Sequence, residues 1–447
     1  MAEHEAPTAQ EILERVERED VRFVRLWFTD VLGQLKSFSI NARQLADAFE
    51  DGIGFDGSSI TGFNPIEESD MVAMPDPATF AILPWRPEDA GVARLFCDVL
   101  TPERTPYEGD PRHVLRRALQ RMRAMGFDSF HIAPELEYFL FRDHRSTEGL
   151  DDGGYFDLTT LDAGSDVRRD TVLALERLGV HVESSHHESG PSQHEIDLAA
   201  APALKVADDC VTARITVKEV AMHYGWHATF MPKPLRDQNG SGMHTHLSLS
   251  RDGRNAFADD GDPFGLSAEG RAFVAGQLRH ARELSALFAQ WVNSYKRLVP
   301  GFEAPTYVAW SRRNRSALAR VPLERAPGRE HDTRLELRCP DPSANPYLTF
   351  AAVLQAGLEG IEKGYELPEP MEQNLYHLAP GDRRRAGIEE LPETLGEAIE
   401  LTASSELVLR TLGEHMFNRY VEIKRREWAE YRVQVTQWEL ERHLPVL

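Results

Sequence analysis

The stretch HIAPELEYFLF, residues 131–141, decides how the chain folds and where its chemistry lies. In an extended strand, successive side chains point to opposite faces. Glu135 and Glu137 therefore share one face, and Leu136 and Tyr138 share the other. Three further stretches repeat this alternation: HEIDL (194–198), GMHTHLSL (242–249) and RLELR (334–338). The pattern predicts strands with one apolar face and one face of carboxylate, imidazole and guanidinium groups.

Solvent exposure alone would explain one such strand, because half-exposed antiparallel sheets also alternate. Four strands enriched in Glu, His and Arg favour a shared cavity instead. Crowded carboxylates raise one another's pKa unless cations neutralise them. Carboxylates with one or two imidazoles suit Mg²⁺ or Mn²⁺ better than structural zinc. The sequence therefore predicts a divalent-metal site. The polar faces of the last three stretches consist of Glu195 and Asp197 in the first, His244, His246 and Ser248 in the second, and Arg334, Glu336 and Arg338 in the third.

The bulk composition limits the classes of protein and partner. The 447 residues predict two or three domains, or one large domain with a small companion. The net charge of −22 argues against nucleic acid or an anionic membrane surface as a partner. No secretory signal and no apolar run of about 18 residues is visible. Cys97, Cys210 and Cys339 lie far apart, as in proteins of the reducing cytoplasm. We therefore expect a cytoplasmic protein.

The first hundred residues read as a small α/β unit. Residues 7–19 favour a helix, and residues 21–40 favour a β-hairpin around a turn. Asn41 is a suitable cap for a further helix, which we expect to run through Glu50.

A linker separates this unit from the rest. Residues 101–110 (TPERTPYEGD) have a linker composition, and Asp110 followed by Pro111 is a typical helix start. We place one domain at residues 1–105 and a larger one at 106–447, whose last part is mostly helical. The predicted class is α+β.

A second feature of the sequence is a set of arginines that could bind anionic groups. Arg297 and Glu303 flank a Pro-Gly turn, and Arg315 and Arg320 follow in SRRNRSALAR. Guanidinium groups bind carboxylates and phosphates bidentately and stay charged. Together with metal-binding carboxylates they suggest phosphoryl transfer, where catalysis is mainly positioning and charge neutralisation. Neither GxxxxGK[ST] nor GxGxxG occurs, so a Walker-type or dinucleotide fold is not expected.

An ordered set of strings resembles type I, bacterial glutamine synthetase, in its short Gram-positive-like subgroup, from about residue 20 onward. The strings are FDGSSI (55–60), PELEYF (134–139), SHHESGPSQHE (185–195), NGSGMHTHLSLS (239–250), NSYKRLVPGFEAP (293–305), NRSALAR (314–320), LELRCPDPSANPYL (335–348) and NLY (374–376). The resemblance implies a small β-grasp-like N-terminal domain, a large domain whose antiparallel sheet forms a half-barrel funnel, and a helical C-terminus.

The resemblance also assigns residues. It implies two or more Mg²⁺ or Mn²⁺ ions per site, with ATP as a substrate. One ion would bind Glu137, Glu188 and Glu195, and the other Glu135, His244 and Glu336. Nucleotide and phosphate contacts would come from Glu183, His246, Ser248, Arg315, Arg320 and Arg334. The glutamate and flap positions would be Asn239, Gly240, Arg297, Glu303 and Arg338, and the ammonium site Asp56, Ser59, Tyr155 and Glu188.

The implied reaction has two steps, forming γ-glutamyl phosphate and then glutamine. Asp56 would take a proton from ammonium, because a free amine is needed for attack. Arg315 would stabilise the phosphoryl group, and the flap carrying Glu303 would exclude water. The resemblance implies two stacked hexameric rings, in which the neighbouring subunit's small domain supplies Asp56.

Three positions depart from the family pattern. The segment VPLERAPGREHDTRL lacks the usual Lys of the nucleotide site, which Arg329 is placed to replace. Pro65 stands where the short subgroup commonly has an Arg used in glutamine feedback. Tyr376 aligns with a tyrosine adenylylated in the longer subgroup, and we expect a plain surface tyrosine here.

Three alternatives remain. A ligase of the same fold acting on a polyamine or ethanolamine would be expected to alter the ammonium pocket, whose residues are all present. A non-catalytic assembly would be expected to lose metal ligands, and all six are retained. A zinc hydrolase built on His244 and His246 is disfavoured, because carboxylates outnumber imidazoles and no HExxH is present.

Overall fold

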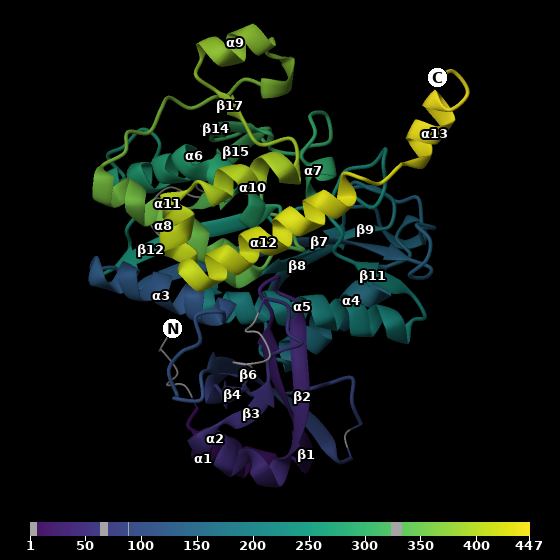
Figure 1. Ribbon diagram of the computed structural model, residues 1–447, viewed down its shortest axis with the longest axis vertical. Helices are drawn as coiled ribbons and strands as arrows, with labels where there is room; N and C mark the ends of the chain where they lie inside the picture. Colours follow the sequence, from purple (N-terminus) through teal and green to yellow (C-terminus); the bar gives the residue numbers. More distant parts are fainter. Residues whose placement is uncertain (1–6, 63–69, 88, 323–332) are drawn as a thin grey trace.

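The computed structural model describes residues 7–62, 70–87, 89–322 and 333–447. It places a small sheet at one end of the molecule and a larger sheet, covered by helices, at the other (Figure 1). Pro65 and Arg329 lie outside the described residues.

The N-terminal sheet has the order β2-β1-β6-β4-β3, with β5 paired to β6. The hairpin predicted for residues 21–40 is confirmed, since β1 and β2 pair antiparallel from Phe23–Asn41 to Thr29–Leu35. The predicted second helix is split, because Asn41 caps a short 3-10 turn that precedes α2. The elements are α1 Ala9–Arg18, β1 Val21–Thr29, β2 Leu35–Asn41, the 3-10 turn Ala42–Gln44, α2 Leu45–Asp51, β3 Ile53–Asp56, β4 Asp70–Pro75, the 3-10 turn Pro77–Thr79, β5 Ala81–Ile82 and β6 Gly91–Leu100.

A buried ion-pair network joins this unit to the next helix. The helix α3, Pro111–Ala124, begins as predicted, with Asp110 accepting a hydrogen bond from the Arg112 amide. The buried Arg112 guanidinium lies 2.7 Å from Asp76 and 2.5 Å from Asp98, and 3.0 Å from Asp208 on α5. The N-terminal unit and the rest of the chain are therefore held together by ion pairs as well as by packing.

The larger sheet has the order β17-β14-β15-β16-β12-β7-β9-β8 and curls into a half-barrel. The four stretches that alternate in sequence are adjacent strands in it, in the order β16, β12, β7, β9. The predicted fold class is thus confirmed. The strands are β7 Ser129–Phe141, β8 Val182–His187, β9 Gln193–Leu198, β10 Ala201–Pro202, β11 His227–Thr229, β12 Thr245–Arg251, β13 Arg254–Asn255, β14 Tyr307–Ser311, β15 Ala317–Arg320, β16 Leu335–Leu337 and β17 Glu389–Glu390.

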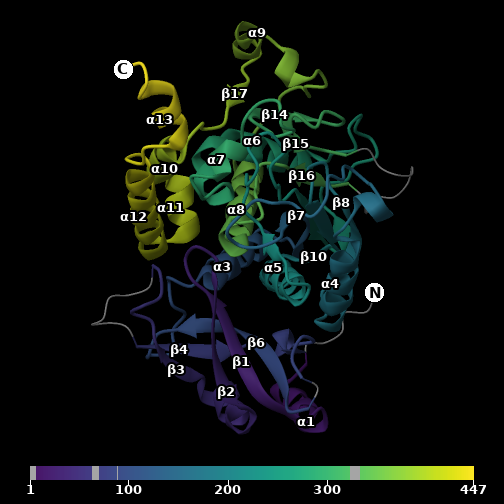
Figure 2. The same ribbon diagram turned by 90° about the vertical axis from the view of Figure 1, so that its right-hand side faces the viewer.

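Helices cover the apolar face of this sheet and build the main core (Figure 2). The helices α6 and α8 pack closely, because a Cβ on Gly276 would lie 2.2 Å from the Ala356 carbonyl oxygen. None of the described helices has the length and apolarity needed to cross a bilayer. The helices, with two further 3-10 turns, are Thr159–Leu161, α4 Ser165–Arg177, α5 Ala203–His223, α6 Ala268–Phe288, α7 Ser294–Arg297, α8 Pro346–Lys363, Leu375–His377, α9 Pro380–Arg385, α10 Leu395–Ala403, α11 Glu406–Leu412, α12 Glu414–Tyr431 and α13 Gln437–His443.

Candidate active site

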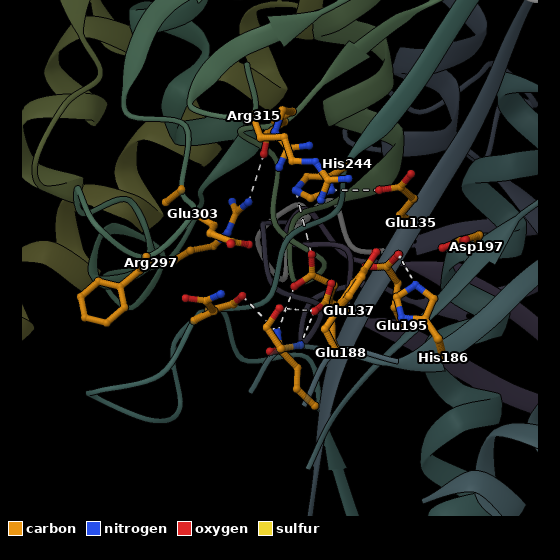
Figure 3. Close-up of a pocket in the computed structure, with 18 of the residues that line it drawn as sticks. Glu135, Glu137, His186, Glu188, Glu195, Asp197, His244, Arg297, Glu303 and Arg315 are labelled. Atoms are coloured by element: carbon orange, nitrogen blue, oxygen red, sulfur yellow. Dashed lines mark hydrogen bonds and ion pairs between the residues drawn. The ribbon is translucent and has the colours of Figure 1, made fainter. Parts of the chain in front are cut away.

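The polar face of the half-barrel encloses two adjoining cavities. One has a volume of about 300 Å³ and the other about 510 Å³, and Glu135, Ser184, Asp197 and Arg320 line both. The first cavity gathers acidic side chains on one side and Arg297, Glu303 and Arg315 on the other (Figure 3). The sequence prediction that these polar faces meet in one place therefore holds.

Strand register produces a first group of carboxylates. Glu137 on β7 lies directly opposite Glu195 on β9, and Glu188 follows β8. Carboxylate oxygens of all three lie within 4.8 Å of one another. Burial raises the pKa of Glu137, and the neighbouring charges of Glu195 and Glu188 raise it further. Burial and nearby carboxylates raise the pKa of Glu195 as well. A bound cation would relieve the repulsion between these crowded carboxylates.

Register also produces a second group, of two carboxylates and imidazole. His246 on β12 is opposite Glu336 on β16, and Glu135 on β7 accepts hydrogen bonds from His246 Nε2 at 2.7 Å and His244 Nδ1 at 2.9 Å. Burial acts to raise the pKa of Glu135, but the hydrogen bonds from the two imidazoles outweigh it and lower the pKa. Glu135 therefore stays ionised.

The two histidines differ in what their second nitrogen does. His246 Nδ1 accepts a hydrogen bond from Arg334 Nε at 3.1 Å, so both of its nitrogens are engaged. His244 Nε2 lies 3.9 Å from Glu137 and faces the first cavity. Burial and the charge of Arg338 lower the pKa of His244 to about 4, which keeps the imidazole neutral. The tightest donor group is Glu135, His246 and Glu336, whereas the resemblance assigned His244 to this group in place of His246.

Arginines close the opposite wall. Arg320 lies 2.7 Å from Glu336, and Arg338 also pairs with Glu336. Burial acts to raise the pKa of Glu336, but the charge of Arg338, the two histidines and Arg320 together lower it. Buried Arg297 donates to the carbonyl oxygens of Cys339 at 2.9 Å and Arg338 at 3.0 Å, which fixes its guanidinium at the cavity wall.

The predicted nucleotide positions divide between the cavities. The second cavity is lined by Glu183, His246, Ser248, Arg320 and Arg334. Arg315 lines the first cavity instead, on the same side as Glu303 (Figure 3).

The predicted glutamate positions line the first cavity. They include Asn239, Gly240, Arg297, Glu303 and Arg338, and Tyr155 joins them. Gly240 has to be glycine, because a Cβ there would lie 2.4 Å from the Pro232 carbonyl oxygen.

Asp56 and Ser59 are not brought to this cavity. Asp56 ends β3 in the N-terminal sheet, where its carboxylate accepts a hydrogen bond from the Ser58 amide at 2.8 Å. That sheet lies at the opposite end of the molecule from the half-barrel strands (Figure 1). Within one chain, the predicted ammonium site is therefore incomplete.

Sequence reasoning missed several supporting residues. His186 is opposite Glu195 in the sheet and lies 3.2 Å from it. Gln193 donates to Glu137 at 3.0 Å and to the Gly240 carbonyl oxygen at 3.1 Å. The alternation of Ser184, His186 and Glu188 could have indicated His186. Nothing local could have indicated the long-range bonds of Gln193.

A further group of possible metal ligands, Asp151, His187 and His194, is outside the lining of both cavities. His187 Nε2 is bonded to Asp151 at 3.0 Å and Nδ1 to the Glu188 carbonyl oxygen at 2.7 Å. His194 Nδ1 lies 2.9 Å from Arg168. These three nitrogens already have partners, whereas the buried His194 Nε2 has no hydrogen-bond partner.

The two groups in the cavity fit divalent cations. Each offers three donors within 4.8 Å, mainly carboxylate oxygens, which suit hard cations such as Mg²⁺ or Mn²⁺. The arginine-lined cavity next to them suits a phosphorylated ligand. Fold and site thus define a metal-dependent protein of the phosphoryl-transfer kind.

Family models cover nearly all of the chain. The glutamine synthetase β-grasp domain matches residues 20–102, and the glutamine synthetase catalytic domain matches residues 108–443. The chain belongs to the glutamine synthetase family.

Individual proteins and solved structures are also similar to the chain over nearly its whole length. The glutamine synthetase of Methanosarcina mazei is 50% identical over 444 residues, 98% of each chain. That of Thermotoga maritima is 48% identical over 441 residues, 98% of this chain and 99% of its own. Among solved structures, a GmaS/ADP complex has a TM-score of 0.88 at 32% identity, covering 97% and 99% of the two chains. Plasmodium falciparum glutamine synthetase has a TM-score of 0.88 at 25% identity, covering 99% and 100%.

Proposed function

We propose that this protein joins ammonium to the γ-carboxylate of glutamate and converts ATP to ADP and phosphate, by way of γ-glutamyl phosphate. The observation that carries the proposal is the meeting of two carboxylate-rich donor groups with an arginine wall in one funnel. Full-length relatives named glutamine synthetase, about half identical, support the same activity.

Two divalent cations, Mg²⁺ or Mn²⁺, would neutralise phosphate charge and orient the phosphoryl group when bound. Glu137, Glu188 and Glu195 would hold one. Glu135, His244 and Glu336 would hold the other, with His244 chosen because it lines the first cavity and its Nε2 lies 3.9 Å from Glu137. Glu183, His246, Ser248, Arg320 and Arg334 line the second cavity, which we assign to ATP. The similar GmaS structure is a complex with ADP, which supports a nucleotide as a ligand of this chain.

The first cavity would take glutamate. Arg297 and Arg338 supply positive charge for its carboxylates, with Asn239 and Gly240 beside them. Arg315, on the same wall, would stabilise charge on the phosphoryl group. Ammonium would sit by Glu188 and Tyr155.

Asp56 would take the proton that ammonium must lose before attack, assisted by Ser59. Because neither residue lines the cavities of its own chain, we propose that a neighbouring subunit supplies them. This favours a homo-oligomer, which we propose is two stacked hexameric rings.

We further propose a domain boundary at residues 105–106 and a cytoplasmic location. The location is supported by three buried cysteines, Cys97, Cys210 and Cys339, none of which is in a disulfide.

Isotope-labelled ammonium tests the proposal. Incubation with glutamate, ATP and Mg²⁺ should give glutamine labelled at its amide nitrogen, with one phosphate per glutamine. Parallel reactions with spermine and ethanolamine test the other amine ligases of this fold. Saturable turnover with an organic amine and none with ammonium would refute the proposal.

A further inference from the structure

The flap that carries Glu303 is held at both flanks by side chains with no assigned role. Residues 300–303 form a turn that belongs to no helix or strand. Glu303 itself has φ of 54°, a left-handed conformation that costs energy for a residue other than glycine. A segment with these properties needs outside contacts to stay in place.

The first contact is from Tyr376 to the residue after Glu303. The Tyr376 hydroxyl donates a hydrogen bond to the Ala304 carbonyl oxygen. Tyr376 is anchored by the buried Leu375 beside it, and its ring lies 5.9 Å from that of Tyr307. Burial raises the pKa of Tyr376 to about 12, so the hydroxyl remains a donor at neutral pH. The expectation of a plain surface tyrosine is therefore wrong: Tyr376 is half-buried and its hydroxyl is bonded.

The second contact is from the residue before Glu303. The Phe302 ring packs on the ammonium group of Lys233, whose Nζ lies 3.6 Å from the ring centroid. Lys233 is buried, and its Nζ also donates to the Gln238 carbonyl oxygen. Gln238 adjoins Asn239 and Gly240, which line the glutamate cavity. Phe302 therefore ties the flap to the loop that we assign to glutamate.

We propose that Tyr376 and Phe302 are positioning residues that hold Glu303 over the first cavity while γ-glutamyl phosphate is present. The inference rests on the proposed function. Without the contacts of these two residues, water would enter the first cavity and its oxygen would attack the γ-acyl carbon. The carbon–oxygen bond to phosphate would break, a proton would pass to solvent, and glutamate and phosphate would be released without glutamine.

The test is the ratio of phosphate released to glutamine formed, at saturating glutamate and Mg²⁺–ATP and limiting ammonium. Tyr376→Phe removes only the hydroxyl, and Phe302→Leu removes the ring on Lys233. Tyr224→Phe is the matched control, because its hydroxyl donates to Asp170 at 2.7 Å away from the cavity. A general loss of stability would lower both products together, so the ratio separates positioning from folding.

We expect Tyr376→Phe to raise the ratio by about two- to tenfold, the factor that one hydrogen bond typically supplies. Phe302→Leu should raise it too, and Tyr224→Phe should leave it at the wild-type value. Should Tyr376→Phe fail to assemble, Phe302→Leu carries the test. A wild-type ratio of phosphate to glutamine in both flap variants overturns the positioning role of Tyr376 and Phe302 and leaves the proposed function standing. A wild-type protein that forms no glutamine refutes the proposed function itself.

Discussion

Glu137 and Glu195 face one another on adjacent strands, each buried and each with its pKa raised by burial and by nearby carboxylates. Their placement follows from a single register of β7 and β9. A shift of either strand by one residue would turn its own carboxylate to the apolar face. Two such carboxyls in contact are stable together only when a proton or a cation shares the site.

This pair predicts a pH-dependent metal affinity. Because the pKa values are raised in the metal-free protein, protons occupy the site at lower pH and must leave when a cation binds. Mg²⁺ or Mn²⁺ should therefore bind more tightly as the pH rises above the ordinary range of a glutamate side chain, with release of protons. Calorimetry in buffers of different ionisation enthalpy measures that release. Affinity that is flat with pH and free of proton release would contradict the prediction.

The position of Glu135 predicts the effect of its removal. Glu135→Gln keeps the size of the side chain but loses the charge that faces His244 and His246. Mg²⁺-dependent glutamine formation should fall by at least about 100-fold, beyond the range for residues that only support a ligand. Glu148→Gln, at an exposed ion pair with Arg142, should leave activity unchanged. Full activity of Glu135→Gln would place the metal site elsewhere.

The joint between the two parts of the chain predicts a stability effect. Arg112→Met would leave Asp76, Asp98 and Asp208 without their buried cation. The free energy of unfolding should fall by about 3–5 kcal/mol. Arg116→Met removes a half-exposed arginine that contacts Asp76 and Asp98, and should cost less than about 1 kcal/mol. Denaturation of both variants at one protein concentration compares them, and equal losses would rule out Arg112 as the main link.

The separation of Asp56 from the cavity predicts complementation between chains. Asp56→Asn and Glu135→Gln should each be inactive alone. If neighbouring subunits share a site, random mixed oligomers should recover about one quarter of wild-type activity, because a site needs one intact residue from each chain. Mixing after dissociation and reassembly, followed by an activity assay, measures this. Recovery of no activity would indicate that each chain completes its own site.

The strands of the site could be predicted from sequence because side-chain alternation in a strand has a fixed period. That period alone put Glu135, Glu137, Glu195 and Glu336 on polar faces, and the structure makes their strands neighbours. Helix limits were less certain, as the split after Asn41 illustrates, since a local cap also fits a 3-10 turn.

Long-range contacts could not be predicted in the same way. The preference between His244 and His246 depends on what each second nitrogen meets, namely Arg334 for His246. The bond from Tyr376 to Ala304 joins residues 72 positions apart, and no local pattern encodes it. The absence of Asp56 and Ser59 from the cavity lining likewise depends on how the two sheets of the chain are placed, which no local pattern encodes.

The central claim is that side chains from separate strands form one centre for two divalent cations. Anomalous diffraction from Mn²⁺-soaked crystals tests it most directly. Two manganese peaks are expected, one bound by Glu137, Glu188 and Glu195 and the other by Glu135, His244 and Glu336. Peaks only at other residues, such as Asp151 and His187, or no peak in the funnel, would contradict the account.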